Sequence, residues 1–364
     1  MTKEEAWFCL CSIPDMDSFR MQRFVSLFDD VRELFSEDLS ELDTGELFSH
    51  AFFATMLAAI RNQDRIPEQM KKLEEKGIRF VSIEDPAYPE RLQTMVDPPL
   101  GLFYRGALPR DGLKSAAIIG ARTCSEYGRN AAYSFGRYLA QNGVQVISGM
   151  ALGADGAGQW GALSAEGKSY AVLGSGADVC YPQEHFPLYE KLCAEGGVIS
   201  EYPPGTPGLA FRFPRRNRII SALSDCVIVI EARKKSGTMT TVDHALNQGK
   251  DVFALPGRYN DPMSQGCNML IKQGAGILTC PEDLAESLGL IPSEGDKKSK
   301  NINLGLAKEE NMVYSCISLQ PKHMDDLLEQ IGQLTVGELS LALMRLEIAG
   351  LIRQSGSGYY VRNE

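Results

Sequence analysis

The sequence predicts an α/β protein built on a doubly wound parallel sheet, with helices before it and a winged-helix module after it. Three patterns lead to this fold class. Helical stripes occupy the first 85 residues, short apolar runs alternate with helix-length segments from about 116 to 290, and a helix followed by two short strands ends the chain. The length of 364 residues fits two or three domains.

The N-terminal segment carries apolar residues at helical spacing. One stripe runs from Phe19 to Phe35, and a second runs from Phe52 to Ile60. Proline-containing clusters at 85–89 and 97–99 then interrupt the chain. We therefore expect a helical domain over residues 1–85.

Seven apolar runs of strand length follow, and most of them end in glycine or a polar residue. Segments of helical length separate most of these runs, which is typical of a doubly wound parallel sheet. This pattern predicts an α/β domain over residues 86–290. The runs are Ala116–Gly120, Val144–Gly149, Tyr170–Gly174, Val198–Glu201, Cys226–Glu231, Val252–Gly257 and Ile277–Thr279.

The end of the chain predicts a linker and a small module. Residues 291–305 are polar and lack periodicity, which favours a linker. Residues 306–364 contain an amphipathic helix that Gly350 closes, and then two short strands joined by a serine-glycine turn. This order favours a winged-helix module. The face of the helix that we expect to be buried consists of Leu339, Ala342, Leu343 and Leu346.

Charge is distributed unevenly along the chain. The net charge of −10 argues against non-specific nucleic-acid binding by the whole protein. Residues 1–100 hold 11 basic and 20 acidic groups, whereas residues 205–235 hold seven basic and two acidic groups. A local anion site therefore remains compatible with an acidic chain.

Composition also limits the compartment and the cofactors. The longest apolar run, Ala51–Ile60, is about half of the ~20 residues that a membrane span needs, and the start of the chain has no signal-peptide pattern. We expect a cytoplasmic protein without a membrane partner. The nine cysteines contain no C-x-x-C pair, and the four histidines lie far apart. We therefore predict neither a metal nor a cofactor.

Glycine-rich loops follow the predicted strands. Ligands of an open parallel sheet bind outside the carboxyl ends of its strands, where helix N-termini add partial positive charge. Each glycine alone could simply make a tight turn, but several such loops at one edge favour a phosphate site. A G-x-G-x-x-G dinucleotide motif is absent. The predicted loop contacts are Gly120, Gly149, Gly153, Gly174, Gly176, Ser236, Gly237 and Thr238.

The segment 211–220 contains four arginines within seven residues. We expect Pro214 at the first helical position, with Arg215 and Arg218 on one face of that helix. The planar guanidinium suits phosphate oxygens, and exposed phenylalanines can stack on bases. The alternative is a solvated basic face, and either way we expect one phenylalanine in the core. The predicted contacts are Arg122, Arg212, Phe213, Arg215, Arg216, Asn217 and Arg218.

No group of residues predicts a convincing catalytic site, because the serines at strand ends lack a G-x-S-x-G context. Asp155 either caps the helix that follows it or acts as an acid or base. Glu201 and Glu231 end predicted strands, and either could hold Arg122 or Arg218 by ion pairing. The alternative function is a nucleotide or nucleotide-sugar hydrolase that uses Asp155 or Glu201 in the same crevice.

At these residues the sequence resembles the DNA-processing protein A family, also called DprA or Smf. The resemblance implies an extended Rossmann domain that binds single-stranded DNA, forms homodimers and has no established enzymatic reaction. It also implies help in loading the RecA recombinase during natural transformation. The flanking modules resemble the sterile-alpha-motif-like and winged-helix domains of the family. The motifs are IIGART-x3-YG (118–128), SGMALGAD (148–155), VLGSGADVCYP (172–182), ISEYPPGT (199–206) and FPRRNRIISALS (213–224).

The resemblance implies specific DNA contacts. They fall on Arg122, and on Arg215 and Arg218 of the F-P-x-R-N-R motif, with Phe213 as the adjacent aromatic.

Two other positions depart from the pattern of the family. Leu152 stands where the family often has arginine, and Gln183 stands where it often has lysine. Two potential phosphate contacts are therefore missing, and Lys234, Lys235 or Lys250 could compensate for them.

The two flanking modules lack the charge of a DNA-binding surface. The N-terminal segment is acidic and lacks the glycines of a helix-hairpin-helix turn, so we expect that it does not bind DNA. The expected recognition helix of the winged-helix module carries only Glu338, Arg345 and Glu347 as charged residues. We therefore predict a protein-contact module, or at most a weak DNA binder.

Overall fold

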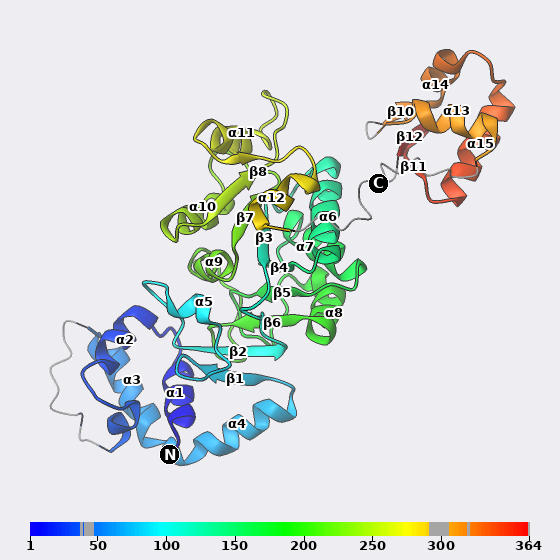
Figure 1. Ribbon diagram of the computed structural model, residues 1–364. Helices are drawn as coiled ribbons and strands as arrows, with labels where there is room; N and C mark the ends of the chain where they lie inside the picture. The colour runs from blue at the N-terminus through cyan, green and yellow to red at the C-terminus, as the bar shows by residue number, and fades with distance from the viewer. Residues whose placement is uncertain (37–38, 40–46, 291–305, 319–320, 363–364) are drawn as a thin grey trace. The chain divides into compact units, whose positions relative to one another are not determined.

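The computed structural model describes residues 1–36, 39, 47–290, 306–318 and 321–362. These residues belong to two compact units, one over residues 1–290 and one over residues 291–364 (Figure 1). The predicted linker at 291–305 lies outside the described residues. Among the helices that are described, none combines the length and the apolar character needed to cross a membrane.

A nine-stranded sheet forms the centre of residues 1–290, and all seven predicted runs contribute a strand to it. The strand order is β1-β2-β6-β5-β4-β3-β7-β8-β9. Strands β3 to β9 pair in parallel, whereas β1 and β2 pair antiparallel at one edge. The strands are β1 (Arg79–Ser82), β2 (Gly101–Gly106), β3 (Ser115–Ile119), β4 (Gln145–Ser148), β5 (Ser169–Val172), β6 (Gly197–Ser200), β7 (Cys226–Val229), β8 (Asp251–Ala254) and β9 (Gly276–Ile277).

Helices connect the parallel strands and set the direction in which the sheet grows. From β3 the chain adds β4, β5 and β6 on one side, and from β7 it adds β8 and β9 on the other. The switch point of this doubly wound sheet therefore lies between β3 and β7, which is where such folds bind ligands. The helices are α6 (Glu126–Gln141), α7 (Ala154–Ser164), α8 (Phe186–Glu195), α9 (Arg212–Ala222), α10 (Gly237–Asn247), α11 (Gln265–Lys272) and α12 (Leu284–Leu288).

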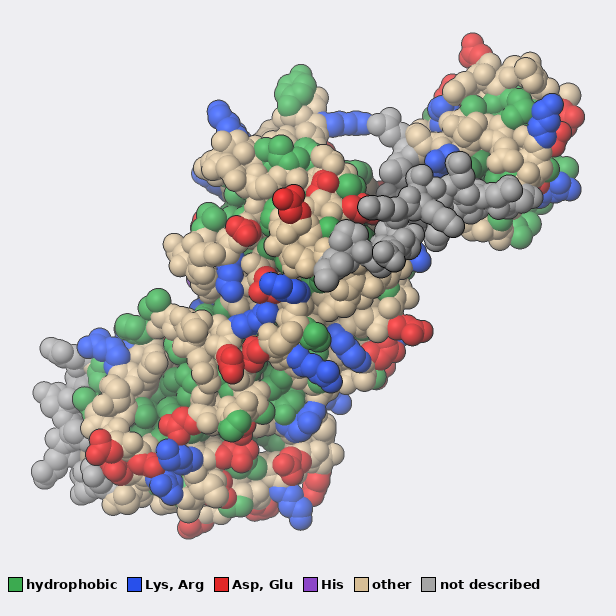
Figure 2. All heavy atoms as spheres, in the orientation of Figure 1, with side chains coloured by type: hydrophobic (Ala, Val, Ile, Leu, Met, Phe, Trp, Pro, Cys, Tyr) green, Lys and Arg blue, Asp and Glu red, His purple; other side chains and the backbone are tan. Residues whose placement is uncertain are grey.

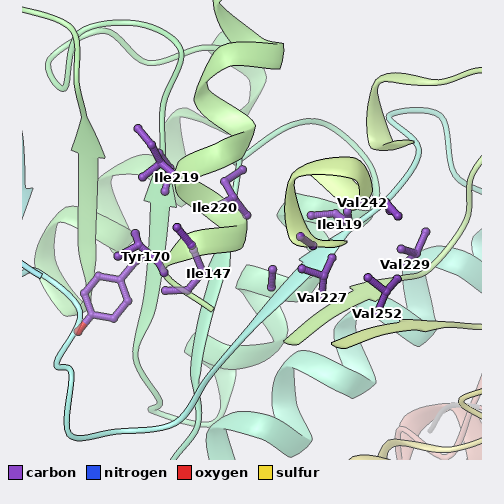
Figure 3. Packing of buried hydrophobic residues seen from close by; sticks show 14 of the residues in the cluster. Ile119, Ile147, Tyr170, Ile219, Ile220, Val227, Val229, Val242 and Val252 are labelled. Carbon is purple, nitrogen blue, oxygen red and sulfur yellow. The ribbon is translucent and has the colours of Figure 1, made fainter. Parts of the chain in front are cut away.

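Both faces of the sheet are apolar because both are covered. Successive residues of β3 point to opposite faces, so Ile119 belongs to one buried cluster and Ile118 to another. Figure 3 shows the first cluster, in which Ile220 of α9 and Val242 of α10 pack towards the strands. The core thereby fixes how α9 and α10 approach the switch point.

The N-terminal region is helical up to β1 and shares its core with the sheet. β1 lies inside the segment 1–85 that we expected to be helical, so that expectation is wrong for its last residues. Phe80 of β1 packs against Phe8 and Phe103, with ring centroids 5.4 and 5.1 Å apart, which ties the helices to the sheet edge. The helices are α1 (Lys3–Cys11), α2 (Ser18–Val25), α3 (His50–Arg61), α4 (Ile66–Glu75) and, after β1, α5 (Glu90–Gln93).

The C-terminal unit has the expected order of helices and strands. The predicted apolar face of α15 (Val336–Ile348) is buried, and Thr335 caps the helix reciprocally with Glu338. The three strands pair in the order β10-β12-β11. The other elements are α13 (Lys308–Cys316), β10 (Lys322–His323), α14 (Met324–Ile331), β11 (Ile352–Gly356) and β12 (Tyr359–Arg362).

Candidate functional site

A cavity of about 460 Å³ opens at the switch point of the sheet. Its walls come from the loop after β3, the first turns of α9 and the start of α10. A smaller recess of about 60 Å³ adjoins it. The predicted residues that line the cavity are Gly120, Arg122, Phe213, Arg216, Asn217, Ser236, Gly237 and Thr238.

Some predicted residues do not line the cavity. Gly149 lines the smaller recess together with Leu152, which is the position where the family often has arginine. The predicted residues that line neither space are Gly153, Gly174, Gly176, Arg212, Arg215 and Arg218.

Helix α9 carries the arginine cluster. It begins at Arg212, so Pro214 is its third residue and not its first, as we expected. The position is still compatible with proline, because the N–H groups of the first turn have no partner within the helix. The earlier start places Arg212 on the first turn. Three of the four arginines of α9 are buried: Arg212, Arg216 and Arg218.

Arg218 is buried in an ion pair with Glu201. Its Nη2 lies 2.7 Å from Glu201 Oε2 and its Nη1 lies 3.0 Å from Oε1, while Nε donates to Asp97 Oδ2 at 3.1 Å. Burial opposes the charge of Arg218, but the two carboxylates outweigh it and raise the pKa of the guanidinium. The predicted pairing of Glu201 with Arg218 is confirmed, and all three kinds of guanidinium nitrogen are engaged.

Arg216 is buried below the loop that follows β4. Its Nη1 donates to the carbonyl oxygens of Gly149, at 2.9 Å, and of Val172. Asp155 accepts from the N–H of Gly149 at 3.1 Å. Burial lowers the pKa of Arg216 to about 10 and raises the pKa of the Asp155 carboxyl. The opposite charges of Arg216 and Asp155 partly offset the cost of burying each charged group. Both side chains therefore help to hold the loop after β4 in place.

We expected Asp155 either to cap the helix that follows it or to act as an acid or base, and the structure shows that it does not cap this helix. Gly153 is the N-cap residue of α7, and no side chain caps that end. The carboxylate instead turns back to the preceding loop. At α6 the N-cap residue is Ser125, whose hydroxyl oxygen accepts from the N–H of Gly128 at 3.0 Å, and Glu231 accepts from the N–H and hydroxyl of Ser125 at 2.7 and 2.6 Å. It therefore does not hold Arg122.

Arg212 contacts the N-terminal region. Its Nη2 lies 2.7 Å from Asp15 Oδ1, and its Nη1 donates to the carbonyl of Pro207 at 2.7 Å. The guanidinium also lies over the rings of Tyr202 and Phe211, 5.4 and 5.1 Å from their centroids. Arg212 therefore anchors the start of α9.

Arg122 and Arg215 are placed differently from the three buried arginines. Arg122 is exposed, and its guanidinium lies 5.2 Å from the ring centroid of Phe213. Arg215 is half-buried. Within the ranges that the structure describes, neither guanidinium has a hydrogen bond or ion pair. These two cations are free to meet an anion.

The wider surface is not uniformly basic. On the face drawn in Figure 2, Lys and Arg side chains are interspersed with Asp and Glu over residues 1–290. Near the cavity, Arg233 lines the wall, and Lys234 and Lys235 beside it are exposed. Attraction of an anion is therefore local to the cavity and its rim.

Aromatic rings form one wall of the mouth. Phe213 stacks on Tyr181 with centroids 5.2 Å apart and an interplanar angle of 26°. Phe213 is half-buried and Phe211 is 65% exposed, so the expectation that one phenylalanine is core is wrong. Tyr181 was missed, although it follows directly on the glycine-rich loop after β5. Its ring is 41% exposed and offers a surface for a base.

The predicted glycines mostly make room for protein atoms. A Cβ at Gly149 would lie 2.6 Å from Arg216 Nη2, and one at Gly174 would lie 2.7 Å from Phe213 Cδ1. Gly153 has φ of +82°, and its Cβ would meet the carbonyl of Ala121. Gly237 differs, because a Cβ there would meet nothing within 4 Å. Ligand access to the backbone is therefore favoured at the start of α10.

Comparison with known proteins identifies the family. Residues 79–289 match the model described as DNA recombination-mediator protein A, and residues 299–358 match the model of the DprA winged helix domain. The chain belongs to the DNA recombination-mediator protein A family.

Two curated relatives show the extent of the similarity. The Escherichia coli Protein Smf is 38% identical over 295 residues, which cover 79% of this chain and 78% of the relative. The Streptococcus pneumoniae DNA processing protein DprA is 40% identical over 203 residues, which cover 56% of this chain and 72% of that protein.

Two solved structures of family members are similar to this chain. The Streptococcus pneumoniae protein has a TM-score of 0.66 at 30% identity, covering 79% of this chain and 98% of that chain. The Helicobacter pylori protein, described for its unique single-stranded DNA binding mode, has a TM-score of 0.51 at 31% identity, covering 57% of this chain and 95% of that one.

Proposed function

We propose that the cavity and its rim bind single-stranded DNA. One observation carries this proposal: among the described residues, Arg122 in the cavity wall and Arg215, which follows the cavity-lining Pro214 on α9, keep their guanidinium groups unpaired. The other three arginines of α9 are buried in protein contacts. Phosphates would lie on these two arginines and on the start of α10. Family membership and the DNA-binding relative from Helicobacter pylori support the same function.

The size and lining of the cavity favour a single strand over a duplex. A space of about 460 Å³ accommodates one nucleotide, so neighbouring nucleotides would follow the rim. The exposed ring of Tyr181 can stack only on a base whose face is open. In a duplex those faces are covered by neighbouring base pairs, so the duplex should bind more weakly.

The geometry supports binding over hydrolysis. Glu201 is engaged by Arg218, and Asp155 is buried and accepts from Gly149. Neither carboxylate is placed as a free acid or base, so a hydrolase remains the weaker alternative. We infer that the protein is not an enzyme, and that in the cytoplasm it binds single strands and helps load the RecA recombinase during natural transformation.

A homodimer formed through the Rossmann-like domain is part of this proposal. Large apolar side chains are exposed on α10, on the loop after β8 and on β9, which lie towards the β9 edge of the sheet. These residues are Leu246, Tyr259 and Ile277. The buried apolar residues of α11 and α12, which are Cys267, Leu270, Leu284 and Leu288, belong to the core and are not available for this face.

The test is the affinity of the full chain for a fluorescent oligo-thymidine, measured by anisotropy beside the matching duplex. We expect tighter binding of the single strand, which weakens as salt rises. The double variant Arg122→Glu/Arg215→Glu should lose binding, because two attractive contacts become repulsive.

The matched control is Arg137→Glu, which reverses an exposed arginine near the end of α6. It should bind like the parent chain. Unchanged affinity in the Arg122/Arg215 double variant, with circular dichroism showing an intact fold, would overturn the proposed site.

A further inference from the structure

Three hydroxyl groups without a protein partner surround the start of α10. Ser236 Oγ is buried and has no hydrogen bond. Thr238 and Thr241 are only 9% and 3% exposed, and both line the cavity. Within the described part of the chain, neither threonine hydroxyl donates or accepts a hydrogen bond. A buried hydroxyl is normally paired, so the unpaired Ser236 Oγ beside two nearly buried threonines points to a ligand.

The backbone at the same place adds donors. α10 has eleven residues, and its N-cap Ser236 makes no side-chain capping bond. The N–H of Met239 donates to the Ser236 carbonyl at 3.1 Å, whereas in the described residues the N–H groups of Gly237 and Thr238 have no backbone acceptor, and the helix dipole favours negative charge there. The open space beside Gly237 lets an anion approach this backbone closely. Together these groups suit the oxygens of a phosphate.

The remaining walls suit a base and a sugar. Ile119, Ile220 and Met263 line the cavity, and Arg233 adds a cation near its rim. Asp155 also lines it, but that carboxylate faces Arg216 and accepts from a backbone N–H. A volume of about 460 Å³ is near the lower end of ligand pockets, which range over roughly 300–1,000 Å³.

We propose that this pocket, formed by Ser236, Gly237, Thr238, Thr241 and the apolar wall, binds a free nucleoside monophosphate. The nucleotide occupies the space that one nucleotide of a bound strand would need, so it competes with single-stranded DNA. The pocket thereby makes DNA binding sensitive to nucleotide concentration. Nucleotide binding itself does not depend on the proposed DNA function.

The experiment is calorimetric titration of the full chain with thymidine, adenosine, guanosine and cytidine 5′-monophosphates. Thymidine and inorganic phosphate are titrated separately. We expect at least one monophosphate to bind, with thymidine about tenfold or more weaker because it lacks the charged group. The same monophosphate should displace fluorescent oligo-thymidine.

Side-chain variants locate the site. Thr241→Val replaces the hydroxyl by a methyl group of similar size and should weaken monophosphate binding by about tenfold. Ser236→Ala should also weaken it. Thr240→Val is the matched control, because Thr240 lies on the same helix but does not line the cavity. It should leave the affinity unchanged.

The outcomes separate this inference from the proposed function. No monophosphate binding at millimolar concentration, with oligo-thymidine binding retained, overturns the nucleotide pocket alone. Binding that is unaffected by both Thr241→Val and Ser236→Ala overturns its location, and binding without displacement of DNA overturns the competition. Monophosphate binding without any DNA binding leaves the pocket and overturns the proposed function.

Discussion

The switch-point cavity and the exposed face of α15 differ in how their charges are used. Within the described residues, Arg122 in the cavity wall and Arg215 on the first turns of α9 have no ion pair. On α15, Arg345 pairs with Glu310 at 3.3 Å. Recognition helices normally enter the DNA major groove with polar and basic side chains. Four of the exposed large side chains of α15 are instead apolar: Val336, Leu341, Met344 and Ile348.

The comparison teaches that the type of module does not decide DNA binding. Unpaired cations and free backbone donors are the features on which we base the proposed phosphate site, even in a chain with a net charge of −10. For the winged-helix module we predict contact with a protein, or at most weak DNA binding. The same distinction applies within α9, where the guanidinium of Arg215 is unpaired among the described residues and that of Arg218 forms an ion pair with Glu201.

The largest expected effect is on the free energy of unfolding, and it comes from the buried ion pair between Arg218 and Glu201. Arg218→Ala should lower the free energy of unfolding by about 3–5 kcal/mol, because it leaves Glu201 buried without its partner. Urea denaturation measures the change. Arg345→Ala in α15 removes a pair whose arginine is 58% exposed and should cost less than about 1 kcal/mol. Equal losses would show that exposure is not the deciding difference.

The next effect is on DNA affinity. Arg122→Glu should weaken oligo-thymidine binding by about tenfold or more, since a phosphate contact becomes repulsive. Arg345→Glu should change it by less than about twofold, because α15 presents no free cation. Anisotropy titration measures both. A larger loss in the α15 variant would transfer the DNA site to the winged-helix module.

A smaller loss is expected at the aromatic wall. Tyr181→Ala should weaken oligo-thymidine binding by roughly tenfold, given that stacking contributes about 1–3 kcal/mol per base. Tyr359→Ala is the counterpart in the winged-helix module, where Tyr359 is 46% exposed beside His323. The Tyr359→Ala variant should bind oligo-thymidine with the affinity of the parent chain. The same titrations compare the two tyrosines, and an identical response would remove Tyr181 from the site.

The smallest effect is expected on the exposed face of α15. Met344 is 60% exposed, so Met344→Glu should change the free energy of unfolding by no more than about 0.5 kcal/mol. Oligo-thymidine affinity should also stay unchanged. Denaturation and anisotropy measure these two quantities. A marked loss of DNA affinity would mean that the apolar face contributes to DNA binding after all.

The sequence predicted the sheet well because its signal is local. Each strand is a short apolar run, and the glycine-containing loops end those runs at one edge. The sequence also suggested that Glu201 could hold Arg218, which the structure confirms. It did not predict β1, because a strand of four residues with only two apolar side chains, Phe80 and Val81, resembles the end of a helical stripe.

The arginines of α9 show what the sequence could not provide. Spacing placed Arg215 and Arg218 on one helix face, but the angle of α9 against the sheet decides which arginine turns inward. Asp97, which accepts from Arg218, lies 121 positions away in the chain. Such long-range contacts leave no local pattern, so the division between buried and free arginines needed the structure.

The most direct test of the central claim is the salt dependence of oligo-thymidine binding, because its slope counts neutralised phosphates. We predict that Arg122→Ala and Arg215→Ala each reduce the slope of log affinity against log salt by about 0.7. Arg137→Ala should leave the slope unchanged. Slopes identical to the parent chain in both cavity variants would contradict the claim that these two free arginines contact the phosphates.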